Sequence, residues 1–201
     1  MPFGQLIREN HNYHPAFCEE NIWHLCQQPS LLNSYVVFIV SKGEAFPMLH
    51  QQASEHPLTP IFWDYHVVLL HLSKEQPKEQ SEKNKTKQNK IIDFDTSLGF
   101  CTDIATYFKE SFVEERFLTD EEVPLFRLVP AKEFVASFCS DRSHMQSPLG
   151  WLAPPPTWPL IGNSKNNLSD FIEASENGVG ELLSYDAVLE RFSCSPHESR
   201  Q

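Results

Sequence analysis

The sequence lacks the long apolar runs that cross membranes. Although 40% of its 201 residues are hydrophobic, no run approaches the roughly 18 to 20 apolar residues that a membrane-spanning helix needs. The amino terminus also lacks the basic and then apolar layout of a signal peptide. We therefore expect a chain without a membrane partner, located in the cytoplasm, with the nucleus as a further compartment.

Paired cysteines are absent as well. The cysteines are five, an odd number, and no two of them form a Cys-x-x-Cys pair: they are Cys18, Cys26, Cys101, Cys139 and Cys194. This pattern argues against both a disulfide framework and a zinc ribbon. His11, His14 and Cys18 carry ligand atoms that suit a metal, but no second pair follows them, so we expect no metal site.

The chain also lacks an excess of basic residues, since its formal net charge is −11. Residues 74–90 contain six lysines and three glutamates, so this segment carries +3 and the remainder carries −14. Nucleic-acid binding depends on neutralising phosphates, so the acidic body argues against a nucleic-acid partner. An acidic surface would suit a cationic ligand, although such surfaces more often only confer solubility.

The composition that is present predicts one catalytic domain, over residues 1–201, with a real hydrophobic core. Residues 1–12 are polar and lack periodicity, so we expect a flexible arm. Residues 74–90 have no aliphatic or aromatic side chain and are predicted to form a mobile, solvated loop. A nuclear-localisation or nucleic-acid role for that loop is an alternative, although its glutamates interrupt the basic run. Residues 194–201 should be a loose tail.

Residues 63–71 read Trp-Asp-Tyr-His-Val-Val-Leu-Leu-His, which indicates a buried central strand that starts after Pro60. Alternate residues of a strand share a face, so Asp64 and His66 are predicted to lie on the same side. A polar residue in such a strand needs a reason. His66 is either a core histidine that is hydrogen-bonded to a neighbour or a functional base.

A short amphipathic helix is predicted to begin at Cys18, because apolar residues follow at helical spacing: Cys18, Ile22, Leu25 and Cys26. Glu19 and Glu20 occupy the first turn, where acids suit the helix dipole. The unpaired N–H groups at a helix start stabilise a thiolate, lower its pKa and can cradle an oxyanion. The alternative for Cys18 is a small buried hydrophobic residue, a role that fits Cys26 better.

Residues 91–96 are predicted to form a strand that pairs antiparallel with the strand of His66. In a register that places Asp93 opposite His66, Asp95 faces Asp64. Asp93 is then the carboxylate that orients the imidazole. Alternatively, the two aspartates only mark a solvated face of the strand.

Further elements complete the expected fold. Residues 34–40 form a strand with 46–51 as its partner, and 126–129 form another strand. Helices are expected at 102–112, 131–139, 167–172 and 185–192. The three prolines 154–156 either wall a groove or act as a stiff connector.

A helix-terminal cysteine, a histidine within a strand and an aspartate on the next strand supply a nucleophile, a base and an orienting group. The thiolate attacks a carbonyl, the imidazole moves the proton, and the carboxylate holds the tautomer. The chain order Cys, His, Asp is that of papain-like and transglutaminase-like enzymes. It also fits a cysteine peptidase or a transglutaminase acting on another amide, or a binding module without activity.

Several blocks of sequence, spread over residues 13–192, resemble the protein N-terminal glutamine amidohydrolase family: residues 18–23, 63–71, 93–96, 140–145 and 154–159. The family's catalytic residues match Cys18, His66 and Asp93. The resemblance implies an α+β, papain-like or transglutaminase-like fold with an antiparallel sheet flanked by helices. It also implies an enzyme without a cofactor, which converts the amino-terminal Gln of proteins or peptides to Glu and feeds the arginylation branch of the N-degron pathway. We further expect a monomer.

Two departures from the family pattern accompany the resemblance. The loop 74–90 is longer and richer in lysine than expected, and Phe17 stands where we expect Tyr, which removes a hydroxyl before the nucleophile. Neither departure touches the three matched residues. Selectivity for a chain terminus requires a carboxylate that accepts the substrate's α-ammonium group, and the sequence leaves the candidates unranked: Glu19, Glu20, Asp64, Asp95 and Asp141.

Overall fold

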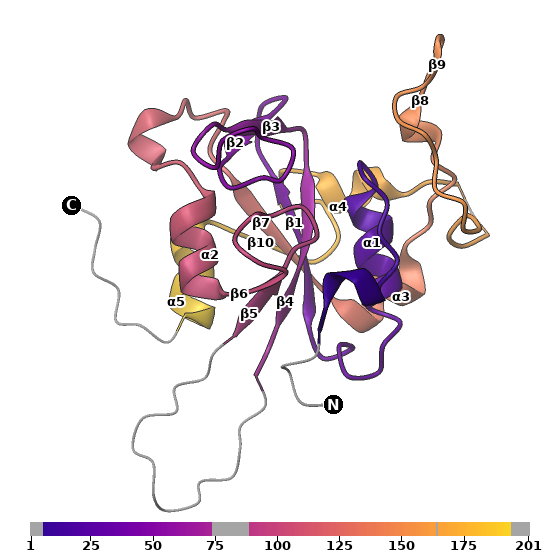
Figure 1. The fold of residues 1–201 in the computed structure, drawn as a ribbon, viewed down its shortest axis with the longest axis horizontal. Helices are drawn as coiled ribbons and strands as arrows, with labels where there is room; N and C mark the ends of the chain where they lie inside the picture. Colours follow the sequence, from indigo (N-terminus) through magenta and orange to yellow (C-terminus); the bar gives the residue numbers. More distant parts are fainter. Residues whose placement is uncertain (1–5, 74–88, 164, 194–201) are drawn as a thin grey trace, which may run out of the picture.

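The computed structural model describes residues 6–73, 89–163 and 165–193, and its centre is a six-stranded sheet (Figure 1). The strands lie in the order β10-β7-β1-β4-β5-β6, and every neighbouring pair is antiparallel. Their bounds are β1 Tyr35–Val40, β4 His66–His71, β5 Lys90–Ile92, β6 Cys101–Asp103, β7 Leu125–Pro130 and β10 Glu181–Leu183. The predicted α+β class with an antiparallel sheet is therefore confirmed.

Helices cover both faces of the sheet. In Figure 1, α2 (Ile104–Ser111) and α5 (Tyr185–Phe192) lie on one side of the sheet. On the other side lie α1 (Cys18–Leu25), α3 (Ala131–Ser137) and α4 (Leu168–Ile172). The strands β1 and β4 are continuous runs of aliphatic and β-branched residues because both of their faces are buried.

Each face of the sheet packs its own hydrophobic cluster. Val67 and Leu69 of β4 join the cluster that includes Cys18 and Ile22 of α1. Val68 and Leu70 point to the opposite face and join Tyr107 of α2. This division follows from the alternation of side chains along a strand. The nucleophile candidate thus lies in the core cluster on one side of β4.

The strand predicted over residues 63–71 is two strands in two sheets. β3 (Ile61–Trp63) pairs with β2 (Phe46–Met48), and β4 begins only at His66. Asp64 lies between them, where its carboxylate accepts a hydrogen bond from the backbone N–H of Tyr65 at 2.9 Å. The prediction that Asp64 shares a strand face with His66 is therefore wrong, because Asp64 lies in a bend between the two strands.

The predicted partner of the strand at 34–40 is also wrong. β1 pairs with β4 and β7, whereas β2 forms a separate two-stranded sheet with β3. Pro47 stands in β2 and has no backbone N–H, which suits a small edge sheet better than a central one.

The register between β4 and β5 differs from the predicted one by two residues. Leu69 pairs with Ile92 and His71 with Lys90, so Asp93 comes directly after the last paired residue instead of opposite His66. Asp95 accordingly does not pair with Asp64. A shift of two residues keeps the same face, so Asp93 still points to the side of His66.

The helix predictions are largely confirmed, with changes at their ends. Helix α1 begins at Cys18, and α4 and α5 match the two predicted C-terminal helices. Helix α2 is shorter than predicted because Cys101–Asp103 form β6, and Asp103 caps α2 through the N–H of Ala105 at 3.1 Å. Strand β10, with only three residues, was not predicted.

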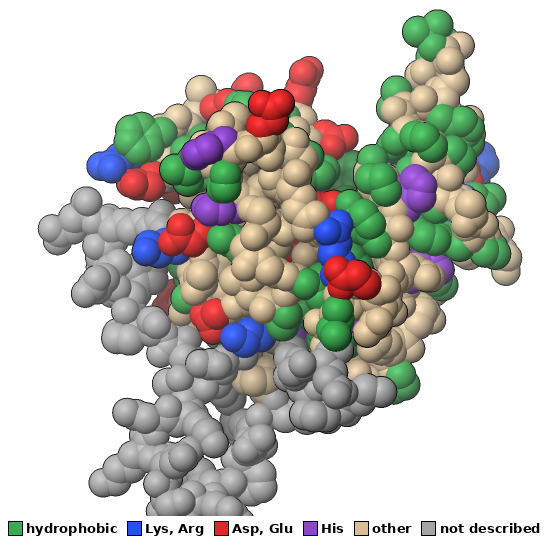
Figure 2. Space-filling view, in the orientation of Figure 1, with side chains coloured by type: hydrophobic (Ala, Val, Ile, Leu, Met, Phe, Trp, Pro, Cys, Tyr) green, Lys and Arg blue, Asp and Glu red, His purple; other side chains and the backbone are tan. Residues whose placement is uncertain are grey.

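Smaller elements complete the structure. They are β8 (Gln146–Ser147), β9 (Gly150–Trp151) and the 3-10 helices η2 (Arg8–Asn10), η3 (Glu115–Phe117) and η4 (Ser143–Met145). The hairpin of β8 and β9 projects from the body (Figure 1) and carries hydrophobic side chains on its surface (Figure 2). Leu149 at its turn is fully exposed.

The described residues include no helix with the length and apolar character that a bilayer crossing requires. The predicted tail 194–201, residues 1–5 of the predicted arm and residues 74–88 of the predicted loop lie outside the described residues. The described part of the arm contacts the body, since Arg8 lies over the ring of Tyr13 at 4.3 Å and His11 stacks on Phe100. Lys90, predicted in the loop, belongs to β5.

Candidate active site

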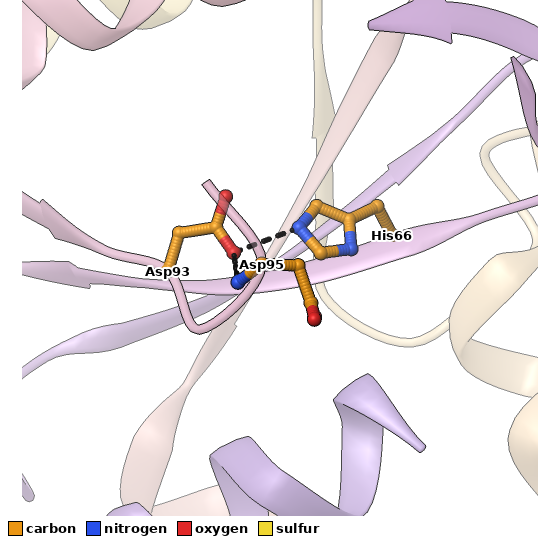
Figure 3. A group of neighbouring side chains, drawn as sticks. All are labelled: His66, Asp93 and Asp95. Carbon is orange, nitrogen blue, oxygen red and sulfur yellow. Dashed lines mark hydrogen bonds and ion pairs between the residues drawn. The ribbon is translucent and has the colours of Figure 1, made fainter. Parts of the chain in front are cut away.

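His66 and Asp93 form a buried pair at one end of the central sheet (Figure 3). His66 is the first residue of β4, and Asp93 follows the last residue of β5. Their side chains are 0% and 1% exposed, and Nε2 of His66 lies 3.0 Å from Oδ1 of Asp93. Neighbouring strands therefore fix the imidazole and the carboxylate on rigid backbone.

The Asp93 carboxylate is held by two further donors. Its Oδ1 accepts the backbone N–H of Asp95 at 2.8 Å, and its Oδ2 accepts the hydroxyl of Tyr107 at 2.8 Å. Burial alone would raise the pKa of Asp93, but the charge of His66 and these hydrogen bonds lower it below its ordinary value. The carboxylate therefore stays charged and fixed in orientation.

His66 keeps one nitrogen free. Because an ionised carboxylate only accepts hydrogen bonds, Nε2 carries the proton that Asp93 binds. Nδ1 is buried and has no hydrogen-bond partner among the described residues. The ring of Trp63 stacks on the imidazole, with centroids 4.6 Å apart. Burial lowers the pKa of His66, but Asp93 outweighs burial and raises it. An imidazole of this kind can accept a proton at Nδ1 and remain stabilised by its carboxylate.

Cys18 lies at the start of α1, packed against β4, and is 6% exposed. Its thiol lies 3.7 Å from Oε2 of Glu19 and hydrogen-bonds to the backbone of Val67, the residue after His66. Asp95 acts electrostatically on both Cys18 and His66. The structure thus places the thiol beside the strand of His66, although the free Nδ1 does not bond it.

The prediction that the helix start lowers the pKa of Cys18 is wrong. Burial raises this pKa well above its usual value, and the nearby carboxylates of Glu19 and Asp95 raise it further. The negative neighbours outweigh the favourable end of the helix dipole. The resting thiol therefore keeps its proton, and a nucleophile forms only when a base takes it.

The backbone at the start of α1 offers hydrogen-bond donors. The first amide that bonds back into the helix is that of Asn21, to the carbonyl of Phe17 at 3.0 Å. Phe17 supplies no side-chain cap. The amide N–H groups that precede Asn21 in the helix, that of Cys18 among them, have no partner within it, which suits an oxyanion.

Glu20 lies on α1 next to the site but has a different set of partners. Its carboxylate accepts bonds from Ser140 Oγ at 2.8 Å, Arg142 Nε at 3.0 Å, Arg142 NH2 at 2.9 Å and Trp158 Nε1 at 2.6 Å. Arg142 also donates to the carbonyls of Pro156 and Trp158. Residues 140–159 are therefore tied to α1 through Glu20, a role that the sequence did not reveal.

The other carboxylates differ in what they contact. Asp141 accepts the backbone N–H of Ser143 at 2.9 Å, and Asp64 is exposed. Oδ1 of Asp95 accepts the hydroxyl of Tyr13 at 2.7 Å, and burial, followed by Asp93, raises the pKa of Asp95. Glu19 is fully buried beside Cys18, where its Oε2 accepts the hydroxyl of Tyr65 at 3.1 Å.

Tyr107 and Tyr65 are site residues that the sequence analysis missed. Tyr107 lies on α2, within the helix predicted at 102–112, and the sequence analysis gave it no part in the site. Tyr65 directly precedes His66, which was a signal in the sequence, but its contact with Glu19 required the position of α1.

One group of possible metal ligands lies within the described chain: His66, Asp93 and Asp95, whose ligand atoms lie within 4.8 Å of one another. Nε2 of His66 and Oδ1 of Asp93 already bond each other, so this donor set serves the hydrogen-bonded pair. His11 and His14, considered as ligands with Cys18, instead contact Gln28 and the carbonyl of Pro15.

Comparisons with known proteins show the family to which this chain belongs. The model of the N-terminal glutamine amidase family matches residues 13–192. A protein N-terminal glutamine amidohydrolase of Bos taurus is 38% identical over 191 residues, which cover 90% of this chain and 86% of the relative. The protein of that name from Drosophila melanogaster is 33% identical over 200 residues, or 94% and 92% of the two chains. The chain therefore belongs to the N-terminal glutamine amidase family and is an amidohydrolase, an enzyme that acts on a linear amide.

Proposed function

We propose that this enzyme hydrolyses the side-chain carboxamide of an amino-terminal Gln of proteins and peptides to Glu, with release of ammonia. The observation that carries the proposal is the buried His66–Asp93 pair, in which Nδ1 of His66 has no hydrogen-bond partner among the described residues, together with a thiol of Cys18 that bonds to the backbone of the next residue, Val67. The names of the relatives supply the substrate. No cofactor enters the proposed reaction.

The reaction begins with proton transfer from the thiol of Cys18 to Nδ1 of His66. The thiolate then attacks the carboxamide carbon and forms a carbon–sulfur bond, while the carbonyl π electrons move to oxygen. Free N–H groups at the start of α1, including that of Cys18, stabilise this oxyanion. The imidazolium of His66 then gives its proton to the carboxamide nitrogen of the substrate. The carbon–nitrogen bond breaks, ammonia departs, and the acyl group remains on Cys18 as a thioester.

Water completes the reaction. His66 takes a proton from the water molecule as its oxygen attacks the thioester carbon. The carbon–sulfur bond then breaks, the thiolate of Cys18 regains the proton, and Glu is released. Asp93 holds the imidazole in one tautomer through both halves and stabilises the imidazolium that each half forms.

The raised pKa of Cys18 supports the assignment of Cys18 as the nucleophile and His66 as its base. A buried thiol among carboxylates does not ionise alone, so its charge must form together with that of a cation. The imidazolium of His66 is that cation, and Asp93 raises the pKa of His66 so that it can hold the proton. The proposed nucleophile is thus an ion pair that forms during the reaction.

The remaining parts of the proposal concern fold, assembly and cellular role. A nucleophile at a helix start, packed on a central antiparallel sheet that carries the histidine and leads into the aspartate, supports a papain-like or transglutaminase-like fold. We further propose a monomer in the cytoplasm, with the nucleus as a further compartment, that acts in the N-degron pathway. Size-exclusion chromatography tests the proposed monomer, and localisation of the tagged chain tests the proposed compartment.

The reaction is tested with matched peptides that differ only at the first residue: free Gln, free Asn, acetylated Gln, and Gln moved to an internal position. Mass spectrometry follows the mass gain of deamidation, and Cys18→Ser protein is the control. We expect free Gln to exceed the other three in kcat/KM by about a thousandfold. Comparable rates on acetylated or internal Gln would instead support a transglutaminase or peptidase.

A further inference from the structure

The first turn of α1 carries two consecutive glutamates with opposite surroundings. Both side chains are 0% exposed. Glu20 is saturated by Ser140, Arg142 and Trp158, and the guanidinium of Arg142 balances its charge. Glu19 uses only Oε2, which lies near the hydroxyl of Tyr65 and the thiol of Cys18. Its Oε1 is buried and has no hydrogen-bond partner in the described part of the chain.

A buried carboxylate without a cation is costly, and such groups are normally paired. Within the described residues, the one basic group at ion-pairing distance from Oε1 of Glu19 is Nε2 of His144, at 3.4 Å. That distance exceeds a normal hydrogen bond, and Nε2 is itself buried without a hydrogen-bond partner in the described chain. Asn166 occupies the other ring nitrogen of His144, at 2.8 Å. The two atoms therefore lie at ion-pairing distance without a hydrogen bond between them.

We propose that Oε1 of Glu19 accepts the α-ammonium group of the substrate, so that Glu19 is the residue that selects a free amino terminus. The inference rests on the proposed function and names the binding residue within it. Its ligand is a primary ammonium group on the carbon chain that carries the carboxamide. His144, which is 19% exposed, forms the outer wall of this subsite.

The geometry next to the thiol fits such a ligand. Oε2 of the same carboxylate lies 3.7 Å from Sγ of Cys18, so a cation on Oε1 is held close to the nucleophile. In Gln, four covalent bonds separate the α-nitrogen from the carboxamide carbon, about 5 Å when extended. A Gln ammonium on Oε1 therefore leaves the carboxamide within reach of Sγ, whereas the side chain of Asn is one bond shorter.

The other acidic candidates are less suited to this role. Glu20 has no free oxygen, and Asp141 accepts a backbone N–H in its own loop. Asp64 is exposed, so water solvates its charge. Asp95 binds Tyr13 through Oδ1 and lies with His66 and Asp93. Glu20 instead assists through Arg142, which anchors the loop that carries His144 two residues later.

Amine binding at Glu19 also favours formation of the nucleophile. Glu19 is one of the carboxylates that raise the pKa of Cys18. An ammonium group on Oε1 offsets that negative charge and makes thiolate formation easier. Occupation of the subsite and activation of the thiol are therefore coupled, and a peptide without the ammonium group loses both binding and rate.

The test uses two peptides that differ only in the α-substituent of the first residue, an ammonium group or a hydroxyl group. For the unaltered enzyme we expect kcat/KM on the ammonium peptide to be about a hundredfold higher. Glu19→Gln should lower kcat/KM on the ammonium peptide by about a hundredfold and change kcat/KM on the hydroxyl peptide little. The ratio of the two kcat/KM values, ammonium over hydroxyl, then approaches one. The matched variants Asp64→Asn and Asp141→Asn should keep the ratio of the unaltered enzyme.

Binding of the same peptides to Cys18→Ser protein, measured by calorimetry, separates recognition from chemistry. The ammonium peptide should lose affinity in Cys18→Ser/Glu19→Gln, while the hydroxyl peptide binds both proteins equally weakly. If Glu19→Gln does not fold, Glu19→Asp, which retracts the charge by one methylene, gives the same comparison of ratios.

The outcomes distinguish this inference from the proposed function. A folded Glu19 variant that deamidates amino-terminal Gln with the ratio of the unaltered enzyme would overturn the role of Glu19 and leave the function intact. If the unaltered enzyme does not act on any Gln-initiated peptide, the proposed function itself fails.

Discussion

Two buried charged clusters flank the start of α1, and they differ in completeness. In the cluster of Glu20 and Arg142, every carboxylate oxygen has a donor and the two charges cancel. In the cluster of His66, Asp93 and Cys18, Nδ1 of His66 has no partner in the described chain, and the thiol is surrounded by charges that oppose its ionisation. Buried polar groups normally have hydrogen-bond partners, so the cluster with an unpartnered atom is the better candidate for a reactive site.

The clusters also differ in how the chain builds them. His66 begins β4, Asp93 directly follows the neighbouring β5, and the two residues are 27 residues apart. Glu20 and Arg142 are 122 residues apart, and Arg142 has a left-handed backbone with φ of +60°. A residue of this size rarely adopts that conformation, so the ion pair must also hold a strained turn. One cluster relies on the sheet, whereas the other imposes order on a loop.

We expect the largest loss of turnover from a change in the cluster of His66, Asp93 and Cys18. Cys18→Ala should lower turnover by at least about ten-thousandfold, because the proposed thioester forms on this thiol. The melting temperature should change little. Cys26→Ser, buried on the same helix, is the matched control and should lower stability by about 1–3 kcal/mol with turnover retained. Substantial activity in Cys18→Ala would remove this cysteine from the mechanism.

Asp93→Asn should be the next most damaging change, with a loss in kcat of about a thousandfold, because an amide cannot stabilise the imidazolium of His66. Asp95→Asn is its control, since the side chain of Asp95 binds Tyr13 and acts on His66 through its charge and not through a hydrogen bond. We expect a smaller loss for Asp95→Asn in steady-state kinetics. The reverse order, in folded proteins, would assign the orienting role to Asp95.

Arg142→Leu tests the complete cluster and should lower the free energy of unfolding by about 3–5 kcal/mol, because it leaves the buried charge of Glu20 without a counter-ion. The double variant Glu20→Gln/Arg142→Leu should recover part of this loss. Urea denaturation of both single variants and the double variant gives the coupling between them. Additive losses would mean that the two residues stabilise the protein independently.

The pH dependence of stability sharpens the comparison further. Burial lowers the pKa of His66, but Asp93 raises it above the ordinary 6.5. A proton bound more tightly in the folded state stabilises the fold below pH 6.5, and this contribution is lost as pH rises through the folded pKa. In Asp93→Asn burial dominates, so protonation of His66 should instead favour unfolding at acid pH.

Chemical denaturation on either side of pH 6.5 measures this change in sign. The control is the same pair of measurements on Asp141→Asn, which lies outside the cluster and should keep the pH dependence of the unaltered protein. An unaltered pH dependence in Asp93→Asn would contradict the assignment of the His66 pKa shift to Asp93.

The smallest expected effect belongs to Tyr107→Phe, which removes the hydroxyl that donates to Oδ2 of Asp93 at 2.8 Å. Loss of this hydrogen bond to a charged group should cost about 1.5–3 kcal/mol of stability and lower kcat by about tenfold. Tyr13→Phe removes the hydroxyl that donates to Oδ1 of Asp95 instead, and it should lower kcat less than Tyr107→Phe does. Equal losses in kcat would show that the orientation of Asp93 does not depend on Tyr107.

The sequence by itself determined the parts that depend on local pattern. Helical spacing after Cys18 predicted α1 and its first residue, and the apolar run after His66 predicted β4. The alternation of side chains, together with a short strand after the loop, was enough to bring Asp93 to His66, because an error of two residues in the register leaves the face unchanged.

Only the tertiary structure decided which charges the site contains. The pKa of Cys18 rises instead of falling because burial and carboxylates that pack around it outweigh a local helix end. Glu19 and Glu20 are adjacent and chemically identical in the sequence, and they differ because Ser140, Arg142 and Trp158 reach Glu20 from distant segments of the chain. Local periodicity reports which face a residue occupies, whereas hydrogen-bond partners and desolvation depend on long-range packing that no short stretch of sequence encodes.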